Sequence, residues 1–91
     1  MSSIHIRTKR LNDKTELRVL IAYDTQYPNK FIQLLTITCN EKVILSIELG
    51  ENTPKNPFFA FTLKPTEAGD KITVSWLDNR GNHEMEKHTI S

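Results

Sequence analysis

The sequence lacks most of the features that mark specialised classes of protein. Its 91 residues include a single cysteine and three glycines, and they contain no internal repeat or low-complexity tract. A lone cysteine excludes an internal disulfide and a zinc site built from several cysteines. No apolar run approaches the roughly 18 residues that a membrane-spanning helix requires, so we expect no membrane span.

The sequence also lacks an excess of charge of either sign. Twelve basic and eleven acidic residues are mixed along the chain and give a formal net charge of +1. Nucleic-acid binding needs a dense basic stripe, and none is present, so we expect no nucleic-acid partner. The N-terminus has no apolar stretch of the kind that directs secretion, which taken alone favours the cytoplasm.

Apolar and polar residues alternate in short segments, with turn residues between them at a spacing of about ten residues. This period of two is typical of half-buried β-strands, and regular short strands are typical of a β-sandwich. We therefore predict one domain spanning residues 1–91, an all-β, immunoglobulin-like antiparallel β-sandwich of about seven strands. The predicted strands cover residues 4–9, 15–23, 30–39, 43–49, 57–64, 71–77 and 83–90.

Two segments in the second half of the chain carry the aromatic residues of the predicted core. Phe59 and Phe61 alternate with small or polar residues, and Trp76 is the last inward apolar residue of the strand 71–77. The turn that follows, 78–81, contains Asp, Asn and Gly, which favour hairpin turns. An anion-binding role for this turn is the alternative, and we prefer a plain hairpin with Arg80 in solvent.

Four apolar residues fall on faces that the alternation assigns to the outside of the sandwich. An exposed apolar patch on a small domain often marks a protein contact, although scattered exposed apolar residues are normal. The strand 30–39 is hard to orient because both of its faces are apolar near its start. In the final strand the apolar residues do not all fall on one face, which a strand at the edge of a sheet tolerates. The candidate interface residues are Ile32, Leu34, Ile44 and Phe58.

The spacing of the cysteine, histidine and methionine residues argues against a catalytic or a metal site. Cys39 has no neighbouring histidine or glycine-rich turn, so we predict a buried, unreactive thiol rather than a nucleophile. The ligand types of a blue-copper site are present in Cys39, His83, Met85 and His88, but Cys39 lies far upstream of the others. We expect no metal, no cofactor and no enzymatic activity, with a small metalloprotein as a distant alternative.

Several of these segments together resemble the SoxZ family of sulfur-oxidation proteins. The resemblance rests on Lys55-Asn56-Pro57-Phe58, on the run Val74-Ser75-Trp76-Leu77-Asp78-Asn79-Arg80-Gly81, on 4–9 and on 31–33. It extends from about residue 4 to residue 81. The chain departs from the family pattern in a shorter segment between Tyr23 and Phe31 and in Leu49, where an aromatic residue is expected.

The resemblance implies a non-catalytic subunit that pairs with a SoxY-like protein as a heterodimer. Together the two would form the carrier of sulfur substrates in thiosulfate and sulfur oxidation, with transient contacts to other enzymes of that process. The sulfur-bearing cysteine belongs to a glycine-flanked arm of the SoxY-like partner, and residues 88–91 here contain neither residue type. The resemblance also implies a periplasmic location reached by export with the partner. The alternative is an independent immunoglobulin-like module that binds a protein or a carbohydrate, or a self-associating domain.

Overall fold

The structure, a computed structural model, is an antiparallel β-sandwich, as the alternation predicted. It describes residues 3–23, 30–51 and 56–91, so the predicted shortening within residues 24–30 lies almost entirely outside the described residues. No helix that could cross a membrane occurs in the part of the chain described. The strands are β1 (Ile4–Arg10), β2 (Thr15–Ile21), β3 (Ile32–Cys39), β4 (Lys42–Glu48), β5 (Phe58–Leu63), β6 (Lys71–Asp78) and β7 (His83–Thr89).

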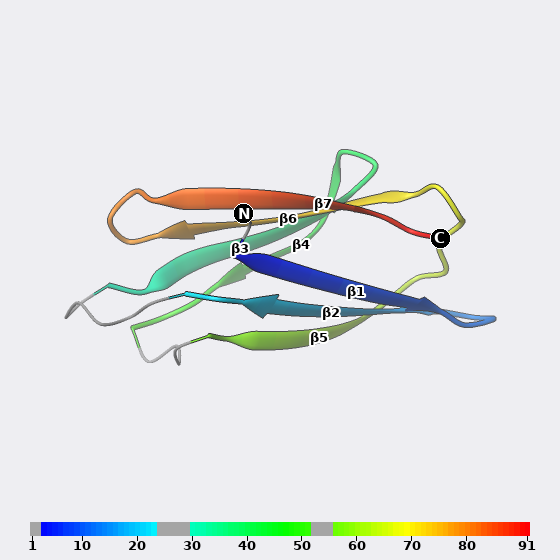
Figure 1. Cartoon of the computed structure of the whole chain (residues 1–91), viewed down its shortest axis with the longest axis horizontal. Coiled ribbons are helices and arrows are strands. Elements are labelled where there is room, and N and C mark those ends of the chain that lie inside the picture. Colours follow the sequence, from blue (N-terminus) through cyan, green and yellow to red (C-terminus); the bar gives the residue numbers. More distant parts are fainter. Residues whose placement is uncertain (1–2, 24–29, 52–55) are drawn as a thin grey trace.

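The seven strands form two sheets that pack face to face (Figure 1). The three-stranded sheet has the order β1-β2-β5, and the four-stranded sheet has the order β4-β3-β6-β7. All pairings are antiparallel, which confirms the immunoglobulin-like sandwich. The prediction that the last strand is an edge strand is also confirmed, since β7 ends the four-stranded sheet.

The core lies between the inward faces of the central strands. Leu17, Val19 and Ile21 of β2 are fully buried against the inward residues of β3 and β6. Burying a side chain of this size contributes about 1.5–3 kcal/mol, which a small domain needs. Phe59 and Phe61 also face inward, but they are only partly buried at the edge strand β5, where their rings stack with centroids 6.1 Å apart.

Side-chain contacts connect the edge strand β1 of one sheet to the edge strand β7 of the other. The Thr8 hydroxyl on β1 and Nε2 of His88 on β7 lie 3.0 Å apart, and the amide of Ser3 donates to the Glu84 carboxylate. Arg10 Nε donates to the carbonyl of Ser91 at 3.2 Å. These contacts place the N-terminal and C-terminal strands next to one another on one side of the sandwich.

Two irregularities change which side chains face inward. In β3 the pairing with β6 shifts between Ile32 and Leu34, so Ile32 lies on the same inward side as Leu35. The prediction that Ile32 faces outward is therefore wrong, and its side chain is fully buried. In β4 the register shifts near Ile44, because Thr38 pairs with Val43 while Ile37 pairs with Leu45.

The β3–β4 hairpin closes through a two-residue turn at Asn40 and Glu41. Asn40 and Glu41 have φ angles of 51° and 71°, both in the left-handed region. Positive φ at both central residues is the signature of a type I′ turn, whose twist matches that of the flanking strands. Asn40 tolerates this conformation, whereas Glu41 adopts it at a steric cost.

Candidate partner interface

The outward face of the four-stranded sheet has no charged side chain at its centre. Its members come from adjacent strands in register: Ser46, Thr36, Ser75 and Met85 form one row across β4, β3, β6 and β7. We define the uncharged face as Leu34, Thr36, Thr38, Val43, Ser46, Thr73, Ser75, Leu77 and Met85. Charged and titratable groups on this face surround the centre, at Glu48, His83 and Lys87 in the neighbouring rows and at Lys71 beyond Thr73.

The uncharged face is built around a pair of leucines. Leu34 on β3 and Leu77 on β6 are cross-strand partners, and Leu77 is 38% exposed. Two shallow hollows, of about 660 and 230 Å3, meet at this pair, because both are lined by Leu34 and Leu77. Hollows beside exposed apolar residues are suited to receive apolar side chains from a partner.

Further exposed apolar side chains extend the uncharged face toward both edges. Met85 on β7 is 61% exposed, and Val43 on β4 is 59% exposed. Between them lie small hydroxyl side chains, which let another backbone approach closely. The sequence signal for Leu77 was available, since Ile72, Val74 and Trp76 face inward and Leu77 has the opposite phase, but our four candidates did not include it.

The four candidate interface residues do not form one patch. Leu34 lies at the centre of the uncharged face, whereas Phe58 lies on the outward side of the other sheet, opposite Leu20. Ile44 is 40% exposed at the irregularity in the edge strand β4, and Ile32 is in the core. Only Leu34 is therefore placed where it can contribute to the uncharged face.

The turn after β6 is a hairpin turn that folds around a buried carboxylate. Asp78 is 1% exposed and accepts four hydrogen bonds. The donors are the Tyr23 hydroxyl at 3.0 Å, the amides of Arg80 and Asn82 at 2.9 and 2.8 Å, and the Asn82 side-chain amide at 3.0 Å. The carboxylate therefore organises this turn through bonds to its own chain.

Burial and hydrogen bonding act in opposite directions on the Asp78 carboxyl. Desolvation by burial, the largest effect, raises its pKa, but the hydrogen bonds from Asn82, Arg80 and Tyr23 together outweigh it and leave the pKa below its usual value. Burial, followed by the bond to Asp78, raises the pKa of Tyr23. Tyr23 therefore stays a hydrogen-bond donor at neutral pH, and its ring packs edge-on against Trp76 at 5.2 Å.

The residues considered for metal binding or nucleophilic chemistry are separated in the structure. His83 and Met85 share the outward face of β7, while His88 points to the opposite side, toward Thr8. Cys39 lies at the end of β3, where burial and then the charge of Asp70 raise its pKa. Across residues 3–23, 30–51 and 56–91 no three His, Cys, Asp or Glu side chains are grouped so as to hold a metal ion.

Comparison with known proteins identifies a family and solved structures of similar fold. Residues 6–89 match the SoxZ family, described as "Sulphur oxidation protein SoxZ". No curated protein sequence matches this chain.

The solved structures that resemble the chain include two reduced-state variants of superoxide reductase (neelaredoxin) from Archaeoglobus fulgidus. The first superposes with a TM-score of 0.72 at 15% identity, covering 99% of this chain and 89% of the other. The second gives 0.69 at 17% identity, with coverages of 99% and 88%. Identities this low establish a shared fold alone.

Proposed function

We propose that this chain, which belongs to the SoxZ family of sulphur oxidation proteins, is a non-catalytic subunit that pairs with a SoxY-like protein. In this proposal the two chains form the carrier of sulfur substrates in thiosulfate and sulfur oxidation. The SoxY-like chain holds the substrate, and this chain stabilises it and helps present it to the enzymes of the process. The proposal extends to a periplasmic location, reached together with the partner.

The uncharged face is the observation that carries the proposal. The centres of protein interfaces are depleted of charged residues, whereas the free surface of a small soluble domain is rich in them. A full sheet face with leucine, methionine and valine exposed among hydroxyl side chains fits an interface core. Glu48, His83 and Lys87 at its margin fit a polar rim.

The chemistry of the remaining residues agrees with a role through contact. The nucleophilic form of a cysteine is the thiolate, and the raised pKa of Cys39 keeps its thiol protonated at neutral pH. Asp78 and Tyr23 are bonded to one another and to the β6–β7 turn. The reactive group of the complex would therefore come from the partner.

Co-expression with a SoxY-like protein tests the pairing. Size-exclusion chromatography with mass determination at micromolar concentration is expected to show one complex at the summed mass of one copy of each chain. Two separate peaks would overturn the pairing and would favour a free-standing immunoglobulin-like module. Cell fractionation with and without the partner gene tests the location, and the chain is expected in the periplasm only when the partner is present.

Oxidation of Met85 tests which face is used. Met85 is 61% exposed in the free chain, so hydrogen peroxide should convert it readily to the sulfoxide. If the uncharged face is covered in the complex, the oxidation rate of Met85 falls by roughly tenfold or more on assembly. An unchanged rate in a complex of the expected mass would place the interface elsewhere.

A further inference from the structure

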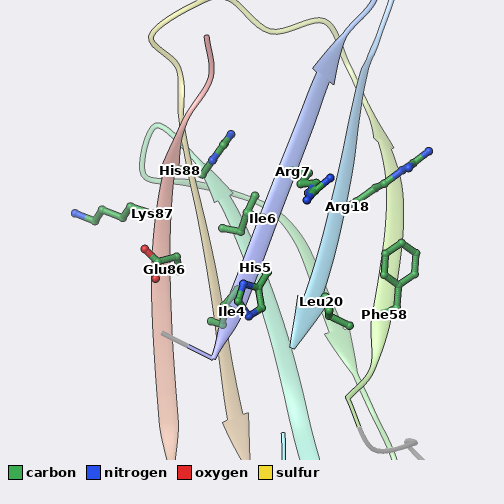
Figure 2. Close-up of a pocket in the computed structure, with 10 residues that line it drawn as sticks. All are labelled: Ile4, His5, Ile6, Arg7, Arg18, Leu20, Phe58, Glu86, Lys87 and His88. Atoms are coloured by element: carbon green, nitrogen blue, oxygen red, sulfur yellow. The ribbon is translucent and has the colours of Figure 1, made fainter. Parts of the chain in front are cut away.

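A groove on the outward side of the three-stranded sheet gathers positive charge beside exposed apolar side chains. It has a volume of about 710 Å3 and runs over β1 from the outward faces of β2 and β5 to β7 (Figure 2). Its charged lining comprises Arg7, Arg18 and Lys87 against one carboxylate, Glu86, with His5 and His88 in addition. The groove is therefore cationic, although the chain as a whole carries a net charge of only +1.

Two arginines at the centre of this groove are direct cross-strand partners. Arg7 on β1 pairs with Arg18 on β2, and Figure 2 shows both side chains at the same level on the outward surface. Like charges directly opposite one another destabilise a sheet. Neither guanidinium makes a hydrogen bond or ion pair with another residue in the described ranges. Glu16, a carboxylate on the same face of β2, is the register partner of Lys9.

The next row of the same face carries two exposed apolar residues beside a histidine. His5, Leu20 and Phe58 are aligned across β1, β2 and β5, with Leu20 41% exposed and Phe58 59% exposed. The row of Arg7 and Arg18 continues on β5 with Ala60, whose small side chain leaves the surface beside Arg18 flat. Arginine and aromatic residues are the types most enriched among residues that dominate binding energy in interfaces.

We propose that this groove binds an extended acidic segment of a partner protein, in which an aspartate or glutamate and a large apolar residue are separated by one residue. Same-face neighbours in a strand are about 6.6–6.8 Å apart, and this spacing separates the arginine row from the row of Leu20 and Phe58. An extended segment running along β1 and β2 has the same spacing between alternate side chains. Its carboxylate accepts hydrogen bonds from Arg7 and Arg18, and its apolar side chain packs on Leu20 and Phe58.

This surface is distinct from the uncharged face. It lies on the other sheet, so both can be occupied at once, and the inference does not depend on the proposed pairing. The acidic segment would belong to a second protein that visits the assembled carrier or the free chain.

Binding of a synthetic peptide tests the proposal directly. The probe is a fluorescein-labelled peptide of four Glu-Thr-Phe-Thr units, and the control peptide has lysine in place of glutamate. Fluorescence anisotropy with the full chain is expected to show affinity at least roughly tenfold higher for the glutamate peptide. This preference should shrink as salt rises from about 0.05 to about 0.5 M, because exposed charges are then screened.

An Arg18→Glu variant separates binding from folding. It replaces the like-charged pair with an opposite-charged pair, so its melting temperature should equal or exceed that of the unmodified chain. Its affinity for the glutamate peptide should nevertheless fall by about tenfold or more, since half of the carboxylate-binding pair is lost. Lys42→Glu, on the exposed edge of the other sheet, is the matched control and should leave peptide binding unchanged.

Several results would overturn the proposal. These are equal affinity for both peptides, no binding at millimolar concentration, and binding that Arg18→Glu does not weaken. Displacement of the peptide by sulfate at equal concentration would identify a small-anion site instead, and dimerisation abolished by Arg18→Glu would identify a second copy of the chain as the occupant. Arg18→Glu should leave assembly with a SoxY-like protein intact, so failure of the two proposals can be distinguished.

Discussion

The two sheets of this protein share one core pattern but differ on their outward sides. Each contributes alternating aliphatic and aromatic side chains to the interior. On the outside, β1 and β2 present His5, Arg7 and Arg18, whereas β3 and β6 present leucine, threonine and serine. The inward residues therefore explain why the chain folds, and the outward residues indicate what each face can bind. An uncharged face suits stable association, and a cationic groove suits a charged segment that binds and leaves.

Replacing Asp78 with alanine should have the largest effect, because this residue links the two sheets. Its carboxylate sits at the end of β6 and accepts a hydrogen bond from Tyr23, which follows β2. The Asp78→Ala change leaves several partly buried donors without their acceptor, so we expect a loss of about 3 kcal/mol in the free energy of unfolding. Urea denaturation measures it. Asp13→Ala, at an exposed turn, is the control and should change stability by less than about 0.5 kcal/mol; equal effects would contradict the role of Asp78.

An arginine placed on each face should distinguish the two surfaces. Leu77→Arg puts a charge at the centre of the uncharged face, and we expect association with a SoxY-like protein to weaken by about 100-fold, or about 2.7 kcal/mol. Leu20→Arg adds the same charge to a face that is already cationic and should alter that association by less than about threefold. Titration calorimetry gives both values. Similar losses in the two variants would show that the partner does not select the uncharged face.

Lowering the pH should reduce the contribution of Asp78 to the free energy of unfolding in a predictable pH range. Despite the opposing effect of burial, the hydrogen bonds to Asp78 hold its pKa below the value of about 3.9 found in unfolded chains. Its stabilising contribution is therefore complete above that value and is lost as the pH falls through the lower pKa of the folded state. Urea denaturation from neutral to acidic pH should show this decline. Asp78→Ala should flatten only part of it, because the amide of Glu67 and the side chain of Asn40 lower the pKa of Asp70 as well.

A smaller, stabilising effect is expected at the hairpin that borders the uncharged face. Glu41 has a φ of 71°, which glycine adopts without steric cost. Glu41→Gly should raise the free energy of unfolding by about 0.5–1 kcal/mol, since Asn-Gly is the preferred type I′ turn. Thermal melting monitored by circular dichroism measures the change. Glu67→Gly, in a loop outside this turn, is the comparison variant and should not stabilise the fold.

The number of strands and their positions along the chain were predictable from the sequence, because alternation of apolar and polar residues is typical of strands. The strands containing Leu17 and Trp76 have most of their large apolar residues on one face, so their orientation was predictable as well. The start of β3 was not, because Ile32 and Leu34 are both apolar and an extra residue between paired positions changes the phase. A bulge of this kind has no consistent signature in a single sequence.

The candidate surfaces were only partly predictable, since they depend on which strands become neighbours. Leu34 and Leu77 both have an outward phase that the sequence shows, but only the pairing of β3 with β6 makes them cross-strand partners. The cationic groove likewise depends on the register that sets Arg7 opposite Arg18. Charges so far apart in the sequence gave no sign of clustering. Alternation reports the face of a residue but not its cross-strand neighbour.

The irregularity at Ile44 has a consequence for how the β4 edge of the four-stranded sheet meets other copies of the chain. A sheet edge next to an uncharged, partly apolar face is a template on which further copies can add and grow into fibrils. The extra residue between Val43 and Leu45 interrupts the outer row of β4, and Lys42 adds a charge beside it. The bulge therefore disfavours the addition of a second copy in register along this edge. The bulge that makes the sheet irregular is thus also a feature that disfavours edge-to-edge aggregation.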